Sequence, residues 1–108
     1  MMEVRLKTLM DIPRLRVAAE AAAALMRTLG NEDRLLLLCE LSQGESSVSE
    51  LAERTGIVQP TLSQQLTVLR GQGLVATRRD GKRIHYSIAD PKALEVLKTL
   101  YRIYCGGK

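Results

Sequence analysis

The sequence contains no phenylalanine, no tryptophan and only three tyrosines. The core must therefore be built from aliphatic side chains, and the aromatic platforms on which single-stranded nucleic acid stacks are not expected. No apolar run approaches the roughly 18 residues of a membrane span. The opening segment MMEVRLKTLM also lacks the apolar stretch and small-residue cleavage site of a secretion signal. We expect a cytoplasmic protein that does not bind membranes.

Residues that carry out catalysis are also scarce. The single histidine, His85, has no second histidine, cysteine or carboxylate at ligand spacing, so a structural or phosphate-contacting role is favoured over metal binding or base catalysis. No nucleophile elbow, phosphate-binding glycine loop or matched carboxylate pair occurs. The sequence therefore predicts a protein that is not an enzyme and has no cofactor.

The chain is long enough for one hydrophobic core but short of two, so we expect a single domain over residues 1–108. The net charge is +4, and the excess is concentrated in one segment from Arg70 to Arg83. Apart from Asp80, the charged residues of this segment are all basic: Arg70, Arg78, Arg79, Lys82 and Arg83. Such a cluster suits an anionic partner, chiefly a phosphate backbone or acidic lipid, with a merely solvated surface run as the alternative.

Capping residues and apolar spacing predict five helices. The first spans 12–29, after Asp11, and the second runs from Asn31 toward Gly44. The others are a short helix opened by a capping box at Ser47-Val48-Ser49-Glu50 and ended by Gly56, one from Pro60 to about Gln72, and one from Asp90-Pro91 through Tyr104. Because only Gly56-Ile57-Val58 joins the third and fourth, they form a helix-turn-helix candidate.

A β-hairpin is expected to follow these helices. Two β-rich runs, 74–79 and 82–88, flank Asp80-Gly81, a strong hairpin signal. A two-residue turn there places Val75 opposite Tyr86 and Thr77 opposite Ile84 on one apolar face. It also places like charges opposite each other at the tip, which costs stability unless the tip meets phosphates or enters a minor groove. The alternative is an exposed hairpin that tolerates this cost.

The helix from Pro60 has an apolar stripe of Leu62, Leu66 and Leu69. Opposite and beside the stripe lie uncharged polar side chains, which suit hydrogen bonding to base edges; a merely polar, solvated face is the alternative. The candidate DNA-binding set combines these side chains with the basic cluster: Gln59, Thr61, Ser63, Gln64, Gln65, Arg70, Arg78, Arg79, Lys82 and Arg83.

The two cysteines, Cys39 and Cys105, lie far apart in the sequence. A cytosolic compartment keeps structural thiols reduced, so they are not read as a disulfide framework. They are either a reactive pair or two buried apolar residues.

Over nearly its whole length the sequence resembles the ArsR/SmtB family of winged-helix repressors. The resemblance is carried by LGNEDRL at 29–35, QPTLSQQL at 59–66 with Leu69-Arg70, GLV at 73–75, and the residues from Arg78 to Ile88. It implies a mainly α fold with a small β-hairpin: a winged helix-turn-helix with five helices plus a wing. It further implies a homodimer built from the first and last helices, with the Pro60 helix in the major groove of duplex operator DNA.

Many members of that family sense metals, and this sequence departs from their motifs. Where the family's third-helix motif has two cysteines, this sequence has Ser47 and Ser49. The second metal site, on the last helix, keeps Asp90 but has Lys92, Ile103 and Gly106 at the later ligand positions. We expect neither metal site to form.

Cys39 and Cys105 instead resemble the two sensing thiols of the sulfide-responsive branch of the family. In that branch reactive sulfur species act as the inducer: they join two cysteines through a disulfide or polysulfide and lower operator affinity. The resemblance implies a repressor of sulfide-detoxification genes. Other inputs (peroxide, heme or none), an antirepressor output for virulence genes, and a protein-binding winged helix stay open.

Overall fold

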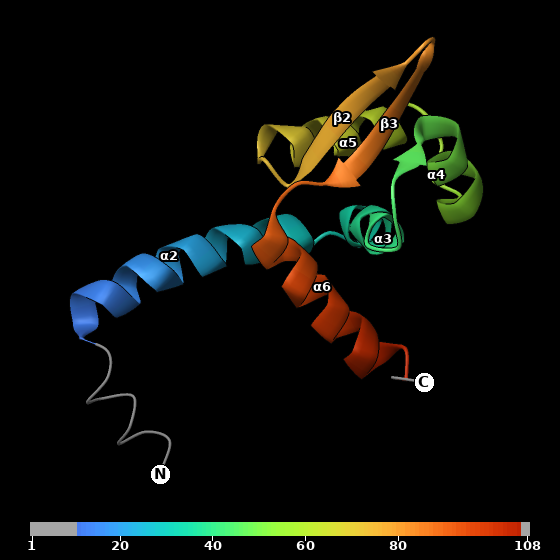
Figure 1. Cartoon of the computed structure of the whole chain (residues 1–108). Coiled ribbons are helices and arrows are strands. Elements are labelled where there is room, and N and C mark those ends of the chain that lie inside the picture. The colour runs from blue at the N-terminus through green and yellow to red at the C-terminus, as the bar shows by residue number, and fades with distance from the viewer. Residues whose placement is uncertain (1–10, 107–108) are drawn as a thin grey trace.

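The computed structural model describes residues 11–106, and its described part has five helices and one three-stranded sheet (Figure 1). The first ten residues, in which we expect no secretion signal, and the last two lie outside the described residues. In chain order the elements are α2 (Ile12–Leu29), α3 (Glu32–Leu41), β1 (Ser46–Ser47), α4 (Val48–Thr55), α5 (Thr61–Gly71), β2 (Val75–Asp80), β3 (Arg83–Ile88) and α6 (Pro91–Tyr104). The predicted fold class, a mainly α winged helix-turn-helix with five helices plus a wing, is confirmed.

The helices begin where their capping residues predict. The side chain of Asp11 accepts a hydrogen bond from the Arg14 N–H at 3.0 Å, and Ser47 and Glu50 form a reciprocal capping box at the start of α4. Asn31 and Asp90 cap α3 and α6 in the same way. These bonds satisfy backbone donors that the first turn of a helix leaves free.

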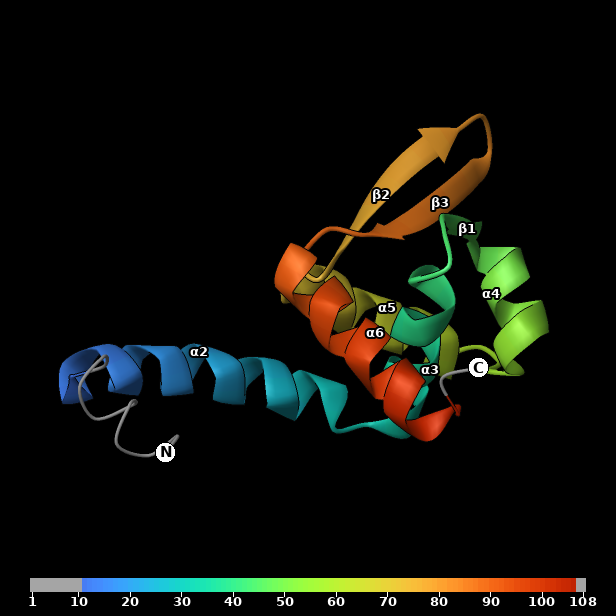
Figure 2. The same ribbon diagram turned by 60° about the horizontal axis from the view of Figure 1, so that its bottom comes forward.

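The core is aliphatic and rich in leucine, as the absence of phenylalanine and tryptophan predicts. Helix α3 contributes Leu37, Leu38 and Leu41, and α5 contributes the expected stripe of Leu62, Leu66 and Leu69. Most of α2 takes no part, because residues 11–23 are all exposed. In both Figure 1 and Figure 2, α2 projects away from the remaining helices and the sheet. Helix α6 packs against α3.

The register predicted for the hairpin is wrong. The structure pairs Val75 with Ile88, Thr77 with Tyr86 and Arg79 with Ile84, because the turn consists of Gly81 and Lys82. Gly81 has a φ of +65°, and no other residue type in the described chain has a positive φ. A turn at Asp80-Gly81 of the usual primed type would have placed Asp80 in that left-handed region, whereas the observed turn places only a glycine there.

The corrected register removes the expected like-charge pairs. Arg78 lies opposite His85 instead of Arg83, and Arg83 lies opposite Asp80. Opposed basic residues therefore do not destabilise the free hairpin. Because the shift moves each partner by two positions, the apolar face of Val75, Thr77, Ile84 and Tyr86 is unchanged.

Strand β1 was not expected from the sequence. Two adjacent serines show no alternating pattern, yet Ser46 pairs with Tyr86 and Ser47 with His85 on the free edge of β3. The sheet order is therefore β1-β3-β2. This pairing ties the middle of β3 to the start of α4. We call the β2–β3 hairpin the wing.

None of the helices in the described part of the chain is both long enough and apolar enough to cross a membrane.

Candidate nucleic-acid interface and cysteine pair

A short, well-bonded turn joins α4 to α5. Gly56 has a φ of +77°, and its N–H donates to the Ala52 carbonyl. The Thr55 hydroxyl donates to the Leu51 carbonyl at 2.6 Å and accepts the Ile57 N–H at 3.2 Å. Because Ile57 is buried, the turn is fixed to the core, and the two helices form the predicted helix-turn-helix.

Helix α5 presents a polar face to solvent. Ser63, Gln64 and Thr67 are exposed, opposite the buried leucine stripe, while Thr61 is half-buried. The Gln59 side-chain carbonyl accepts hydrogen bonds from both the backbone N–H and the hydroxyl of Ser63, at 3.1 and 2.7 Å. Gln59 therefore caps the helix and holds Ser63, while the Gln64 amide forms no side-chain hydrogen bond to another described residue.

Gln65 has a different environment from Gln64. It is half-buried, and its side-chain carbonyl accepts a hydrogen bond from Arg34 Nη1 at 3.1 Å. Arg34 also donates through Nε to the Thr28 carbonyl at 2.7 Å, in the last turn of α2. Arg34 therefore connects α5 to the end of α2, a role that no local sequence pattern indicates.

The basic residues of the wing fall into two groups. Arg78 is held by Glu45 in a two-bond ion pair, with distances of 3.0 Å from Nε and 2.8 Å from Nη2. The hydrogen bond from Arg78 lowers the pKa of the Glu45 carboxyl below its ordinary value. The other basic side chains of the wing are exposed and form no ion pair within residues 11–106: Arg79, Lys82 and Arg83. The same holds for Arg70, in the last turn of α5.

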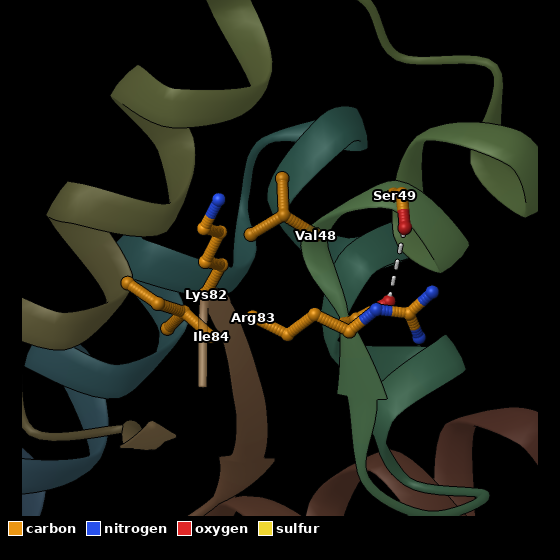
Figure 3. A pocket seen from close by; sticks show the side chains of 6 residues that line it. Val48, Ser49, Lys82, Arg83 and Ile84 are labelled. Atoms are coloured by element: carbon orange, nitrogen blue, oxygen red, sulfur yellow. Dashed lines mark hydrogen bonds between the residues drawn. The ribbon is translucent and has the colours of Figure 1, made fainter. Parts of the chain in front are cut away.

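Near its tip the wing borders a cavity of about 310 Å³ that it shares with the start of α4. Figure 3 shows Lys82, Arg83 and Ile84 on the wing side, with Val48 and Ser49 across the cavity. The hydroxyls of Ser47 and Ser49 lie 3.2 Å apart and bond to each other. At the two positions where metal-sensing relatives are expected to carry thiolates, one serine thus caps α4 and the other bonds to that cap.

His85 is half-buried, in the middle of β3. Its Nε2 atom is buried and has no hydrogen-bond partner in the described structure, and its backbone lies between Ser47 and Arg78 in the register. Among residues 11–106, no group of three or more His, Cys, Asp or Glu side chains is placed to hold a metal ion.

The two cysteines, distant in sequence, line one groove. Cys39 is half-buried on α3, and Cys105 is exposed at the C-terminal cap of α6. The groove has a volume of about 250 Å³, and we call it the cysteine groove; its lining is Glu32, Leu35, Leu36, Cys39, Leu100, Tyr101, Tyr104 and Cys105. Burial raises the pKa of the Cys39 thiol, and the charges of Cys105 and Glu40 raise it further.

Comparison with known proteins gives consistent results. The model of the arsR family of bacterial regulatory proteins matches residues 31–77. The biofilm growth-associated repressor of Agrobacterium fabrum is 48% identical over 94 residues, which cover 87% of this chain and 80% of that protein. The transcriptional activator HlyU of Vibrio cholerae is 34% identical, with 89% of each chain covered.

A solved structure of a similar protein has the same fold. The transcriptional repressor BigR from Xylella fastidiosa superimposes with a TM-score of 0.79 at 46% identity, covering 87% of this chain and 93% of that chain. With this fold, this helix-turn-helix and these relatives, the chain belongs to the ArsR family of bacterial regulatory proteins, as a DNA-binding transcriptional regulator and not an enzyme.

Proposed function

We propose that this protein is a cytoplasmic homodimeric repressor that binds duplex operator DNA and releases it when reactive sulfur species join Cys39 to Cys105. The observation that carries the proposal is that both thiols line the cysteine groove, although one is on α3 and the other at the end of α6. The names of the Agrobacterium fabrum and Xylella fastidiosa proteins support the repressor part of the proposal.

On DNA, α5 lies in the major groove and the wing contacts the backbone or the adjacent minor groove. The exposed Gln64 amide suits bidentate bonding to adenine, and the Ser63 hydroxyl is held in place by Gln59. The exposed cations Arg70, Arg79, Lys82 and Arg83 supply phosphate contacts that are independent of sequence.

Dimerisation uses α2 and α6. The exposed first half of α2 has no partner within the described chain, and α6 carries exposed Ile103 outside the lining of the cysteine groove. In a symmetric dimer the two α5 helices must be separated by about 34 Å, the distance between successive major grooves on one side of the duplex. Because α6 belongs to the dimer interface in this proposal, a covalent link between α6 and α3 changes that separation.

The proposed switch is a thiol exchange reaction in which the persulfide donor is the only oxidant. One thiolate attacks the outer sulfur of a persulfide, RSSH, and forms a protein persulfide with release of RSH. The second thiolate then attacks the inner sulfur, forms the Cys39–Cys105 disulfide and releases H₂S. Longer donors leave extra sulfur atoms in the bridge, and each adds about 2 Å of reach beyond the Cα separation that a simple disulfide allows.

One relative supports a second output. HlyU is named an activator, so displacement of another repressor is the alternative to direct repression. Among alternative inputs, the cysteine groove disfavours an enclosed heme, because its volume of about 250 Å³ lies below the roughly 300–1,000 Å³ of pockets for drug-sized ligands.

The proposal is tested on an operator selected from random duplexes with the reduced full-length protein. Anaerobic anisotropy titrations are made with and without a persulfide donor, peroxide or heme, at two salt concentrations. We expect persulfide to weaken operator binding by at least about tenfold and dithiothreitol to restore it. Binding that does not depend on salt would favour a protein-binding module, and release by peroxide or heme but not by persulfide would contradict the proposed input.

A further inference from the structure

The cysteine groove has a composition that distinguishes among sulfur donors. Besides the two cysteines, six residues line the groove: three leucines, two tyrosines and one carboxylate, Glu32. Leu36, Tyr101 and Tyr104 are exposed, with 43%, 50% and 80% of their surfaces accessible, so the apolar wall of the groove can be reached from solvent. No basic residue lines it.

From this lining we propose that the cysteine groove is a binding site for small, uncharged, apolar organic trisulfides, and that it selects them over anionic donors of the same sulfur content. The inference deepens the proposed function, on which it rests, by naming the donor class that reaches the two thiols.

The volume of the cysteine groove favours a small donor. The groove volume of about 250 Å³ lies below the range of about 300–1,000 Å³ that accommodates drug-sized ligands. A dialkyl trisulfide with short alkyl groups fits such a space with its sulfur chain beside both cysteines. A donor that carries peptide groups on each side of the sulfur chain must leave most of its body in solvent, and it gains little from the leucines and tyrosines.

The carboxylates at the cysteine groove favour a neutral donor. Glu32 lines the groove, and Glu40 lies next to Cys39 in α3 and contributes to raising the pKa of that thiol. An anionic donor therefore meets repulsion from carboxylates and loses hydration against an apolar wall. A neutral apolar donor meets neither cost and buries alkyl groups against Leu36 and the tyrosines.

The reaction balances with the trisulfide RSSSR as the only co-reactant. The first cysteine thiolate attacks the central sulfur, forms a Cys–S–S–S–R adduct and releases one RS⁻. The second cysteine thiolate attacks the same former central sulfur and releases the other RS⁻. The result is a three-sulfur bridge between Cys39 and Cys105, and the two thiol protons end on two molecules of RSH.

The test compares dimethyl trisulfide with the trisulfide of mercaptoacetate, a small donor that carries two carboxylates. Reduced full-length protein is mixed with each donor, the reaction is quenched by alkylation, and bridge formation is followed by intact mass. Each rate is divided by the rate of the same donor with a free cysteine derivative, which removes intrinsic reactivity. We expect the normalised rate to be at least about tenfold higher for dimethyl trisulfide.

Variants of two groove residues test whether the groove causes the preference for dimethyl trisulfide. Glu32→Gln should speed the anionic donor by about twofold to threefold at low salt and leave dimethyl trisulfide unchanged. Glu95→Gln is the matched control, since Glu95 is an exposed carboxylate on α6 outside the groove lining. Leu36→Ser should slow dimethyl trisulfide without changing the anionic donor.

The outcomes separate this inference from the proposed function. If neither donor forms a bridge, the two-cysteine switch itself is wrong. If both form the bridge at equal normalised rates, or if the preference is the same in Glu32→Gln and Leu36→Ser as in the parent, the switch stands and selection by the groove is overturned.

Discussion

Gln64 and Gln65 are identical neighbours in the sequence with different surroundings in the structure. Gln64 is exposed and its amide is not engaged by the described protein, whereas the Gln65 carbonyl accepts a hydrogen bond from Arg34 at 3.1 Å. An amide that is free in the unbound protein can bond to an adenine edge without first breaking an internal hydrogen bond. We therefore expect Gln64 to read bases on DNA and Gln65 to position α5.

The first prediction concerns Gln64→Ala. Loss of a bidentate base contact should weaken operator binding by about 1–3 kcal/mol and leave binding to random duplex nearly unchanged. Gln72→Ala is the control, since Gln72 is exposed and lies at the C-terminal cap of α5, two turns away from Gln64. Anisotropy titrations with both duplexes measure the difference, and an equal loss on operator and random DNA would rule out base reading by Gln64.

The second prediction concerns Cys39. Burial, together with the charges of Cys105 and Glu40, raises the pKa of its thiol. The reactive species is the thiolate, so its alkylation rate should rise with pH and reach its plateau at a higher pH than that of a free thiol. In a Cys105→Ser background, where burial still acts, the shift should persist. Iodoacetamide labelling across pH measures it against a free cysteine derivative, and a coincident profile would show that burial does not govern this thiol.

At the scale of elements, the wing is held to the helix-turn-helix by more than its hairpin turn. Strand β1 adds to the edge of β3, and Glu45, just before β1, binds Arg78 of β2 through both carboxylate oxygens. The same ion pair occupies the Arg78 guanidinium in the unbound protein, so we expect this group to be less available to DNA phosphates. Glu45 thus orients the wing and reduces its positive charge.

The third prediction follows from this ion pair. Glu45→Gln should free Arg78, strengthen binding to duplexes of any sequence, and steepen the slope of log affinity against log salt by about one. Glu53→Gln removes the same charge from an exposed residue of α4 that forms no ion pair in the described structure. If the two variants bind DNA equally, Arg78 gains no phosphate contact.

Elements whose signals are local could be predicted from the sequence. The start of α2 at Ile12, the capping box of α4 and the leucine stripe of α5 follow from residues a few positions apart, and all three are confirmed. The hairpin register was wrong because two turns compete at Asp80-Gly81-Lys82, and the choice depends on which residue takes a positive φ. Strand β1 depends on a free edge of β3, which no local pattern records.

In the candidate site, too, features with local signals were predictable from the sequence and features that depend on packing were not. The polar face of α5 is a periodic feature and was predictable. The bonds from Arg34 to Gln65 and from Arg78 to Glu45 join residues 31 and 33 positions apart, and such pairs depend on how the elements pack. The shared groove of Cys39 and Cys105 likewise depends on α6 packing against α3.

In the whole molecule, most of α2 is exposed and packs against no other part of the described chain; we call this exposed part the arm. Residues 11–23 are exposed, and Figure 2 shows the arm extending beyond the rest of the structure. One stripe of the helix carries Leu15, Ala22 and Met26, which recur at helical spacing, and the neighbouring stripe carries Arg16, Glu20, Ala23 and Arg27. The apolar stripe suits the proposed contact with a second copy, and the charged stripe suits solvent.

The fourth prediction compares the same substitution on the two stripes. Ala22→Glu should bury a carboxylate in the proposed dimer contact, shift the protein toward monomer and weaken operator binding, because one half-site is then bound alone. Ala23→Glu should do neither. Analytical ultracentrifugation and operator titration measure both effects, and equal behaviour of the two variants would exclude this stripe from the interface.

Whether a link between two thiols carries the signal is decided by comparing the parent with Cys39→Ser and Cys105→Ser. Operator affinity and intact mass are measured on the same samples before and after persulfide treatment. We expect the parent to gain an internal sulfur bridge and lose at least about 1.4 kcal/mol of binding free energy, a tenfold weakening. Each single variant should bind the operator normally and not respond. If either variant releases DNA like the parent, modification of one thiol carries the signal and the two-cysteine account is contradicted.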